Sequence, residues 1–117
     1  INAAIGCAQM EQLDDFVNKK RAMATRYKTF FDSLPVEFID EPEKSRSNFW
    51  LNAILFNDHL EKGMFLDISN KQNVMTRPSW TIMTKLSPYQ DCFKFNDLSQ
   101  SELIADRLVN ISSSVIA

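Results

Sequence analysis

The sequence predicts an α+β domain in which a small, mainly antiparallel sheet of about three strands packs against helices. The chain has 117 residues, a length that suits one domain with one core. Residues 2–34 repeat apolar side chains at three- and four-residue steps, which is the spacing of an amphipathic helix. Residues 48–56 form a nearly continuous apolar run, which is typical of a central strand covered on at least one face.

The N-terminal helical pattern is not uniform along its length. Its first turns carry small side chains, including Ala4 and Ala8, which allow another element to approach closely. The adjacent Asp14 and Asp15 indicate a bend or the start of a second helix. Pro35 ends the pattern, because proline lacks an amide N–H and disfavours helical geometry in the residue before it.

The three expected strands lie at residues 36–39, 48–56 and 73–77. A polar loop at residues 40–47 separates the first two strands, and Pro78 is expected to end the third. Residues 109–116 form either a short strand or an extended tail.

Two further helices are expected. The first covers residues 60–70 and places Met64, Phe65 and Ile68 on one face. The last begins near Ser99, since Glu102 follows it at the spacing of a capping box.

Residues 79–96 have no clear period and contain Pro88, so they are expected to form a long ordered loop. Long loops in compact domains are often functional, which makes this segment a candidate for ligand contacts.

The charge balance disfavours nucleic acid and anionic membranes as partners, because the formal net charge is -2 and the pI is about 5.3. The longest basic run, residues 19–21, falls within the helical pattern and indicates a solvated helix face. No apolar run is long enough to span a bilayer, and a cytoplasmic protein is expected.

The sequence holds no complete set of catalytic or metal-binding residues. Cys7 and Cys92 are far apart and are interpreted as buried thiols in a reducing compartment. His59 is the single histidine, so no His/Cys cluster for a metal can be assembled and no metal site is expected. No phosphate-binding, dinucleotide-binding or serine-nucleophile motif occurs.

Four segments, in order and at matching spacing, resemble the DegT/DnrJ/EryC1/StrS family of sugar aminotransferases. They are NAAIGCAQMEQL at residues 2–13, SNFWLNAIL at 47–55, MTRPSW at 75–80 followed by KLSPY at 85–89, and ADRLVNISSS at 105–114. The resemblance covers nearly the whole chain. It is nearest to enzymes that aminate nucleotide-activated keto-sugars for bacterial surface glycans, such as the legionaminic acid and perosamine branches.

The resemblance implies that residues 1–117 are the C-terminal small domain of a fold-type I aminotransferase, with residues 1–34 as its linking helix region. Such enzymes use pyridoxal phosphate (PLP), held by a lysine as a Schiff base, to move an amino group, typically from glutamate, to a keto-sugar. The resemblance places that lysine in a large domain ahead of Ile1. The sequence begins without a Met and is already in the helical pattern, which agrees with this expectation. No catalytic residue is therefore assigned here, and no PLP is expected to bind this segment alone.

The resemblance also implies partners and site residues. The expected partners are the large domain, a second subunit in a homodimer, and a nucleotide-sugar substrate. Arg77 is a candidate for pairing with a carboxylate or phosphate, Trp80 for stacking on a ring, and Lys85 for neutralising a phosphate. The alternative is that Trp80 fills a domain interface and Arg77 forms a surface ion pair. Asn2 is the one candidate for a cofactor contact.

Three departures from the family pattern bear on the substrate contacts. Thr84 stands where many relatives have His, residues 87–88 are Ser-Pro in place of the usual Leu-Pro step, and Ser112 stands where relatives often have Pro.

Two other functional classes remain open from the residues alone. A free-standing, non-enzymatic α+β binding module would have a self-contained surface without an orphan apolar face. A nucleic-acid binder is disfavoured by the charge balance.

Overall fold

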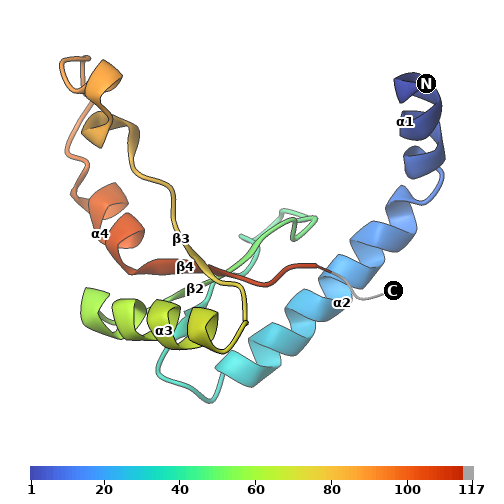
Figure 1. Cartoon of the computed structure of the whole chain (residues 1–117), viewed down its shortest axis with the longest axis horizontal. Helices are drawn as coiled ribbons and strands as arrows, with labels where there is room; N and C mark the ends of the chain where they lie inside the picture. The colour runs from blue at the N-terminus through green and yellow to red at the C-terminus, as the bar shows by residue number, and fades with distance from the viewer. Residues whose placement is uncertain (115–117) are drawn as a thin grey trace.

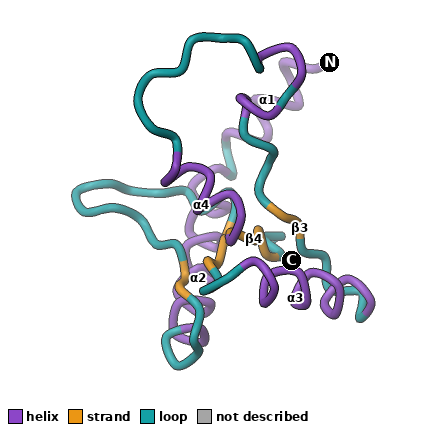
Figure 2. Tube along the Cα trace, turned by 90° about the vertical axis from the view of Figure 1, so that its left-hand side faces the viewer, coloured by secondary structure: helices purple, strands orange, loops and turns teal. Residues whose placement is uncertain are grey.

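The computed structural model describes residues 1–114, which form four α-helices and four β-strands. In chain order they are α1 (Asn2–Met10), α2 (Leu13–Phe31), β1 (Glu37–Phe38), β2 (Asn52–Leu55), α3 (His59–Lys71), β3 (Arg77–Pro78), α4 (Ser99–Arg107) and β4 (Leu108–Ile111). Two 3-10 turns, η1 (Met83–Lys85) and η2 (Ser87–Tyr89), lie in the long loop before α4. The strands are short central segments surrounded by helix and loop (Figure 2).

The strands form one sheet in the order β1-β2-β4-β3, and every neighbouring pair is antiparallel. The predicted α+β class is confirmed, although the sheet has a fourth strand. That strand is β4, from the segment for which a strand or a tail was expected, and it lies beside β2 in the centre. Residues 48–51 belong to no strand, so the run at 48–56 contributes only its second half to the sheet.

One face of the sheet carries the core. Ile54 of β2 lies opposite Val109 of β4, and both side chains are fully buried. Phe31 of α2 and Phe65 of α3 pack on this face, which α2 and α3 cover together. Burying a side chain such as Ile contributes about 1.5–3 kcal/mol, so each member of this small cluster contributes measurably to stability.

The other face of the sheet carries a different set of side chains. Because residues alternate between faces along a strand, Ala53, Leu55, Asn110 and Arg77 all lie opposite the core cluster. This open face is neither wholly apolar nor wholly polar. It is therefore suited to hold a ligand or a partner surface.

The long N-terminal helix divides where the acidic pair indicated a second start. A two-residue break at Glu11–Gln12 separates α1 from α2. Asp14 and Asp15 then occupy the first turn of α2, where negative charge is favourable to the helix dipole. α1 has no buried residue and no side-chain cap, so little within the described chain holds it.

Two expectations, about β3 and α3, were wrong in detail. Pro78 lies within β3 rather than after it, which is possible because β3 is an edge strand with one free side. Of the face predicted for α3, Phe65 packs against the core, whereas Met64 and Ile68 are exposed and Leu66 packs there in their place. The helix period was correct there, but the buried face is rotated away from the face predicted.

Two local predictions were also wrong. The capping box at Ser99 does not form: Leu98 is the N-cap residue, and Asp97 accepts hydrogen bonds from the Ser99 amide at 3.0 Å and hydroxyl at 2.7 Å. Both cysteines, Cys7 and Cys92, are exposed rather than buried.

An ion pair fastens the loop after β1 to α2. The Arg21 guanidinium donates to both Glu41 carboxylate oxygens, at 2.9 and 2.7 Å, and to the Ser47 carbonyl at 2.6 Å. It also lies over the ring of buried Phe49, 5.4 Å from the centroid. The hydrogen bonds from Arg21 and from the Ser47 amide lower the pKa of Glu41 from 4.5 to about 2.

The fold exposes far more surface than its mass requires. A folded monomer of this size exposes about 6,500 Å², whereas this chain exposes 9260 Å². Its radius of gyration is 17.1 Å, against about 13 Å for a compact domain of this length. Figure 1 shows why: α1 with the start of α2 rises on one side of the sheet, and the loop at residues 79–96 rises on the other.

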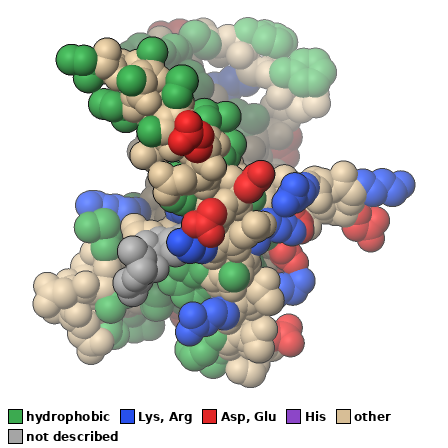
Figure 3. Space-filling view, turned by 90° about the vertical axis from the view of Figure 1, so that its right-hand side faces the viewer, with side chains coloured by type: hydrophobic (Ala, Val, Ile, Leu, Met, Phe, Trp, Pro, Cys, Tyr) green, Lys and Arg blue, Asp and Glu red, His purple; other side chains and the backbone are tan. Residues whose placement is uncertain are grey.

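We call these two projections the helical arm (residues 1–16) and the loop arm (residues 79–96). Both carry exposed apolar side chains. On the helical arm these are Ile1, Ile5, Met10, Leu13 and Phe16, and on the loop arm Trp80, Met83, Leu86, Tyr89, Phe93 and Phe95. In the space-filling view, apolar side chains gather over the upper part of the molecule and most charged ones lie lower (Figure 3).

Among the described helices, none combines the length and the apolar character needed to cross a lipid bilayer.

The Arg21–Glu41 pair predicts a specific acid dependence of stability. The Glu41 pKa is depressed in the folded state, so its stabilisation is complete above about pH 4.5 and is lost as the pH falls through about 2. We expect Glu41→Gln to be less stable than the unchanged chain at pH 7, and the gap in urea midpoint to close between pH 4.5 and 2. Glu43→Gln, in the same loop, is the matched control. A gap that stays constant over this range would contradict the assignment.

Candidate functional site

Two adjoining pockets open on the sheet face opposite the core. The larger, of about 550 Å³, is lined by Leu51, residues 77–81 and Asn110. The smaller, of about 270 Å³, is lined by Lys20, residues 50–51, Met75, Arg77 and residues 110–114. Leu51, Arg77 and Asn110 line both pockets, so the two form one groove along the open face.

Arg77 is positioned by a polar cluster at the end of α3. The Ser69 and Thr76 hydroxyls are 2.6 Å apart, and Asn70 Nδ2 donates to Thr76 Oγ1 at 2.9 Å and to the Thr76 carbonyl at 3.2 Å. The amide of Val74 donates to the Ser69 carbonyl at 2.8 Å. These bonds hold the backbone immediately before Arg77, whose own side chain is exposed toward the groove.

Trp80 lies at the base of the loop arm. The preceding residue, Ser79, donates from its hydroxyl to the Ala105 carbonyl at 2.8 Å and from its amide to the Leu108 carbonyl at 3.3 Å. These bonds fix the start of the arm to the junction of α4 and β4. The Trp80 side chain itself is 72% exposed, so a large flat apolar surface borders the groove.

The structure brings Arg77 and Trp80 together but places Lys85 elsewhere. Lys85 lies in η1 and shares a pocket of about 210 Å³ with Trp80, Glu102 and Asp106. The two carboxylates make that pocket unfavourable for an anionic group. Phosphate neutralisation by Lys85 therefore stays a prediction that its surroundings do not support.

The other predicted positions lie away from the groove or at its edge. Asn2 is exposed at the start of α1, on the arm opposite the Trp80 loop (Figure 1). Thr84 and Ser87 lie in the two 3-10 turns of the loop arm. Ser112 follows β4 and lines the smaller pocket, where its carbonyl accepts from the Tyr27 hydroxyl at 2.9 Å.

Sequence reasoning missed Asn110 and Leu51, which line both pockets. The alternation of β4 does carry a signal, because Asn110 is the polar residue between buried Val109 and Ile111. Its partner across the sheet, Arg77, could be identified only from the register of β3 on β4.

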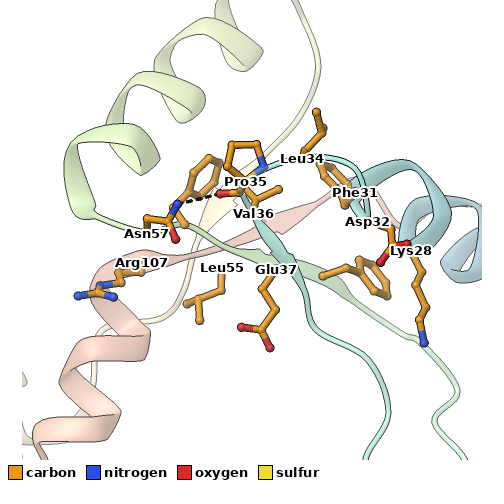
Figure 4. Close-up of a pocket in the computed structure, with 12 residues that line it drawn as sticks. Lys28, Phe31, Asp32, Leu34, Pro35, Val36, Glu37, Leu55, Asn57 and Arg107 are labelled. Atoms are coloured by element: carbon orange, nitrogen blue, oxygen red, sulfur yellow. Dashed lines mark hydrogen bonds between the residues drawn. The ribbon is translucent and has the colours of Figure 1, made fainter.

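A cavity of about 570 Å³ lies at a different place, between the end of α2, β1 and the end of β2. Figure 4 shows its mixed lining, with Lys28 and Asp32 on one side, Arg107 on the other and Glu37 between them. Lys28 is also ion-paired with Asp40, and that pair raises the pKa of the Lys28 ammonium. This cavity contains none of the predicted site residues.

No group of three His, Cys, Asp or Glu side chains in residues 1–114 is arranged to hold a metal ion.

The sequence matches the model of the DegT/DnrJ/EryC1/StrS aminotransferase family over residues 1–115. It is 35% identical over 68% of its length to EpsN of Bacillus subtilis strain 168, whose name describes a pyridoxal phosphate-dependent aminotransferase. It is 29% identical over 86% of its length to GDP-perosamine synthase of Escherichia coli O157:H7. The matches cover 21% and 27% of those relatives, so the chain spans only about a quarter of their length.

The fold also matches solved structures. The aminotransferase TlmJ from Streptoalloteichus hindustanus superposes with a TM-score of 0.82 over 93% of this chain and 29% of its own, at 19% identity. The antiparallel sheet and its helices are thus the small-domain fold of PLP-dependent aminotransferases. Together with the match over residues 1–115, this shows that the chain belongs to the DegT/DnrJ/EryC1/StrS aminotransferase family.

Proposed function

We propose that this chain is the substrate-contacting small domain of a PLP-dependent enzyme that transfers an amino group, from glutamate, to a nucleotide-activated keto-sugar for bacterial surface polysaccharide. The observation that carries the proposal is the groove on the open sheet face, where Arg77, Asn110 and Trp80 line one pocket. The similarity to a GDP-perosamine synthase supports a sugar nucleotide as the substrate class.

The groove has the chemistry that such a substrate requires. Arg77 offers a planar cation with five N–H donors, which matches carboxylate and phosphate oxygens. Trp80 offers an exposed aromatic face on which a base or sugar ring can stack. Asn110 supplies an amide that both donates and accepts hydrogen bonds, so it suits sugar hydroxyls.

The lysines that line the five described pockets do not fit the cofactor itself. A lysine that binds PLP covalently must reach the neutral amine form, which a desolvated pocket promotes. Lys28 is instead held as a cation by Asp40, Lys20 is hydrogen-bonded to backbone carbonyls, and Lys85 lies beside two carboxylates. We therefore assign this chain no covalent step and place its contribution at the substrate.

The excess surface supports a partner within the whole enzyme. The two apolar arms flank the groove, and the surface in excess of a compact domain is about 2,700 Å², within the range of obligate interfaces. We propose that the lysine-bearing large domain, and a second subunit of a homodimer, cover these arms. Asn2, near the tip of the helical arm, is then our candidate for a contact with the cofactor of such a neighbour.

The arms predict self-association of the chain when it is alone. Because apolar patches of this size are rarely left in water, we expect sedimentation velocity to show dimers or larger species at high concentration. Ile5→Asp with Phe16→Asp should shift the distribution toward monomer. Asp substitutions at exposed Arg26 and Lys71 are the matched control. A strict monomer at high concentration would instead favour the free-standing binding module.

A fusion tests the enzymatic proposal directly. The chain is joined behind the lysine-bearing part of the E. coli GDP-perosamine synthase, in place of the matching segment, and amino transfer from glutamate to that enzyme's sugar nucleotide is measured. We expect turnover from the fusion and none from the chain alone. Turnover by the chain alone, or an inactive fusion that is folded and binds PLP, would contradict the proposal.

The same fusion tests the role of Arg77. We expect Arg77→Ala to raise KM about tenfold or more, because a hydrogen bond to a charged group contributes about 1.5–3 kcal/mol. Arg26→Ala removes an exposed arginine from α2 and should leave KM unchanged. An unchanged KM in Arg77→Ala would show that this arginine does not contribute to substrate binding.

A further inference from the structure

The smaller pocket of the groove has an unusual charge. Its lining includes two cations, Lys20 and Arg77, together with the hydroxyl-bearing residues 112–114 and Asn110, and it includes no carboxylate. A water-accessible recess that gathers cations and neutral donors without a counter-charge attracts an anion.

The other cavities show that this composition is not general to the surface. The cavity beside Lys28 includes Asp32 and Glu37. The pocket around Lys85 includes Glu102 and Asp106. The recess beside Arg21 includes Asp40 and Glu41, which are ion-paired to its cations. Only the two pockets of the groove, among these five, are lined without an acidic residue.

Lys20 is held in place and retains capacity to bind. Its ammonium donates to the Ser113 carbonyl at 2.5 Å and lies 3.4 Å from the Trp50 carbonyl. An ammonium has three donors, so one remains after these two contacts. Neither contact neutralises its charge, and within residues 1–114 no carboxylate is ion-paired to it.

The rest of the pocket wall is fixed by buried hydrogen bonds. The Ser113 hydroxyl accepts from the Asn52 amide at 2.8 Å and donates to the Ile111 carbonyl at 3.0 Å. These bonds tie the segment after β4 to β2 and leave exposed Ser112 and Ser114 on either side. Arg77, across the pocket, has no ion pair within the described residues, so its guanidinium donors are available.

We propose that Lys20 and Arg77 form a subsite for the phosphate or pyrophosphate group of a ligand, with Ser112 and Ser114 as hydroxyl donors. Its assignment to the diphosphate of a nucleotide sugar rests on the proposed function. The groove supports this assignment, because Trp50 lines the phosphate pocket and Trp80 lines the adjoining one. A diphosphate at Arg77 would therefore have an exposed aromatic ring in each of the two pockets, one for the base and one for the sugar.

The subsite is tested by titrating the 117-residue chain with inorganic phosphate, pyrophosphate, UDP and GDP. Amide chemical shifts follow the site, and tryptophan fluorescence follows the two rings. We expect the largest shifts at Lys20, Arg77 and residues 112–114, and binding that weakens as NaCl rises. Fluorescence should change with UDP or GDP in Trp80→Phe, which retains only Trp50. Pyrophosphate binding without any gain for the nucleotides would limit the subsite to the anion and overturn its nucleotide assignment.

Matched variants isolate the two cations. We expect Lys20→Met and Arg77→Gln each to weaken pyrophosphate binding about tenfold, from the loss of one charged hydrogen bond. Lys19→Met removes the same charge from the neighbouring residue on α2, and Arg26→Gln removes an exposed arginine; neither should change binding by more than about twofold. If Lys20→Met unfolds, Lys20→Arg retains the charge and should preserve pyrophosphate binding. Unchanged pyrophosphate binding by Arg77→Gln would then overturn the subsite.

The outcome separates this subsite from the proposed function. Equal binding by Lys20→Met and Lys19→Met, or shifts that map to the Lys28 cavity, would overturn the subsite even if the fusion enzyme transfers amino groups. Pyrophosphate binding that depends on Lys20 and Arg77, with no transfer by the fusion enzyme, would retain the subsite and remove the aminotransferase proposal.

Discussion

The pairing of β2 with β4 is the constraint on which the rest of the structure depends. Ile54 and Val109 face each other across that pair and are completely buried, so both strands contribute to the centre of the core. The two strands lie more than fifty residues apart in sequence, so pairing them costs loop-closure entropy. That cost is offset when α2 and α3 bury the same face of the sheet. The opposite face then carries Arg77 and Asn110, which line both pockets of the groove.

Some cations of α2 are neutralised by carboxylates and others are not, and this difference explains where an anionic ligand can bind. Arg21 and Lys28 are neutralised by Glu41 and Asp40, and those bonds fasten the loop after β1. Lys20, one residue from Arg21 on the same helix, points to a different side and meets only carbonyl oxygens. One short basic run on α2 thus supplies a structural cation and a candidate ligand contact.

The sequence predicts the element types well because their periods are local properties. The helix break near Asp14, the stop before Pro35 and the polarity of the loop at residues 40–47 follow from nearby residues alone. The choice of buried face on α3 does not. Met64 and Phe65 are neighbouring apolar residues, and the position of the sheet beside the helix decides that Phe65 packs on the core while Met64 is exposed. The pocket lined by Lys20 could not be predicted from the sequence for the same reason. Its lining comes from α2, β3 and the segment after β4, which only the strand register brings together.

The first helix of the helical arm, α1, is weakly anchored within the described chain. A nine-residue helix with no buried side chain and no side-chain cap is marginal in water by itself, and the break at Glu11–Gln12 separates α1 from the better-anchored α2. The order of α1 therefore depends on what lies against it.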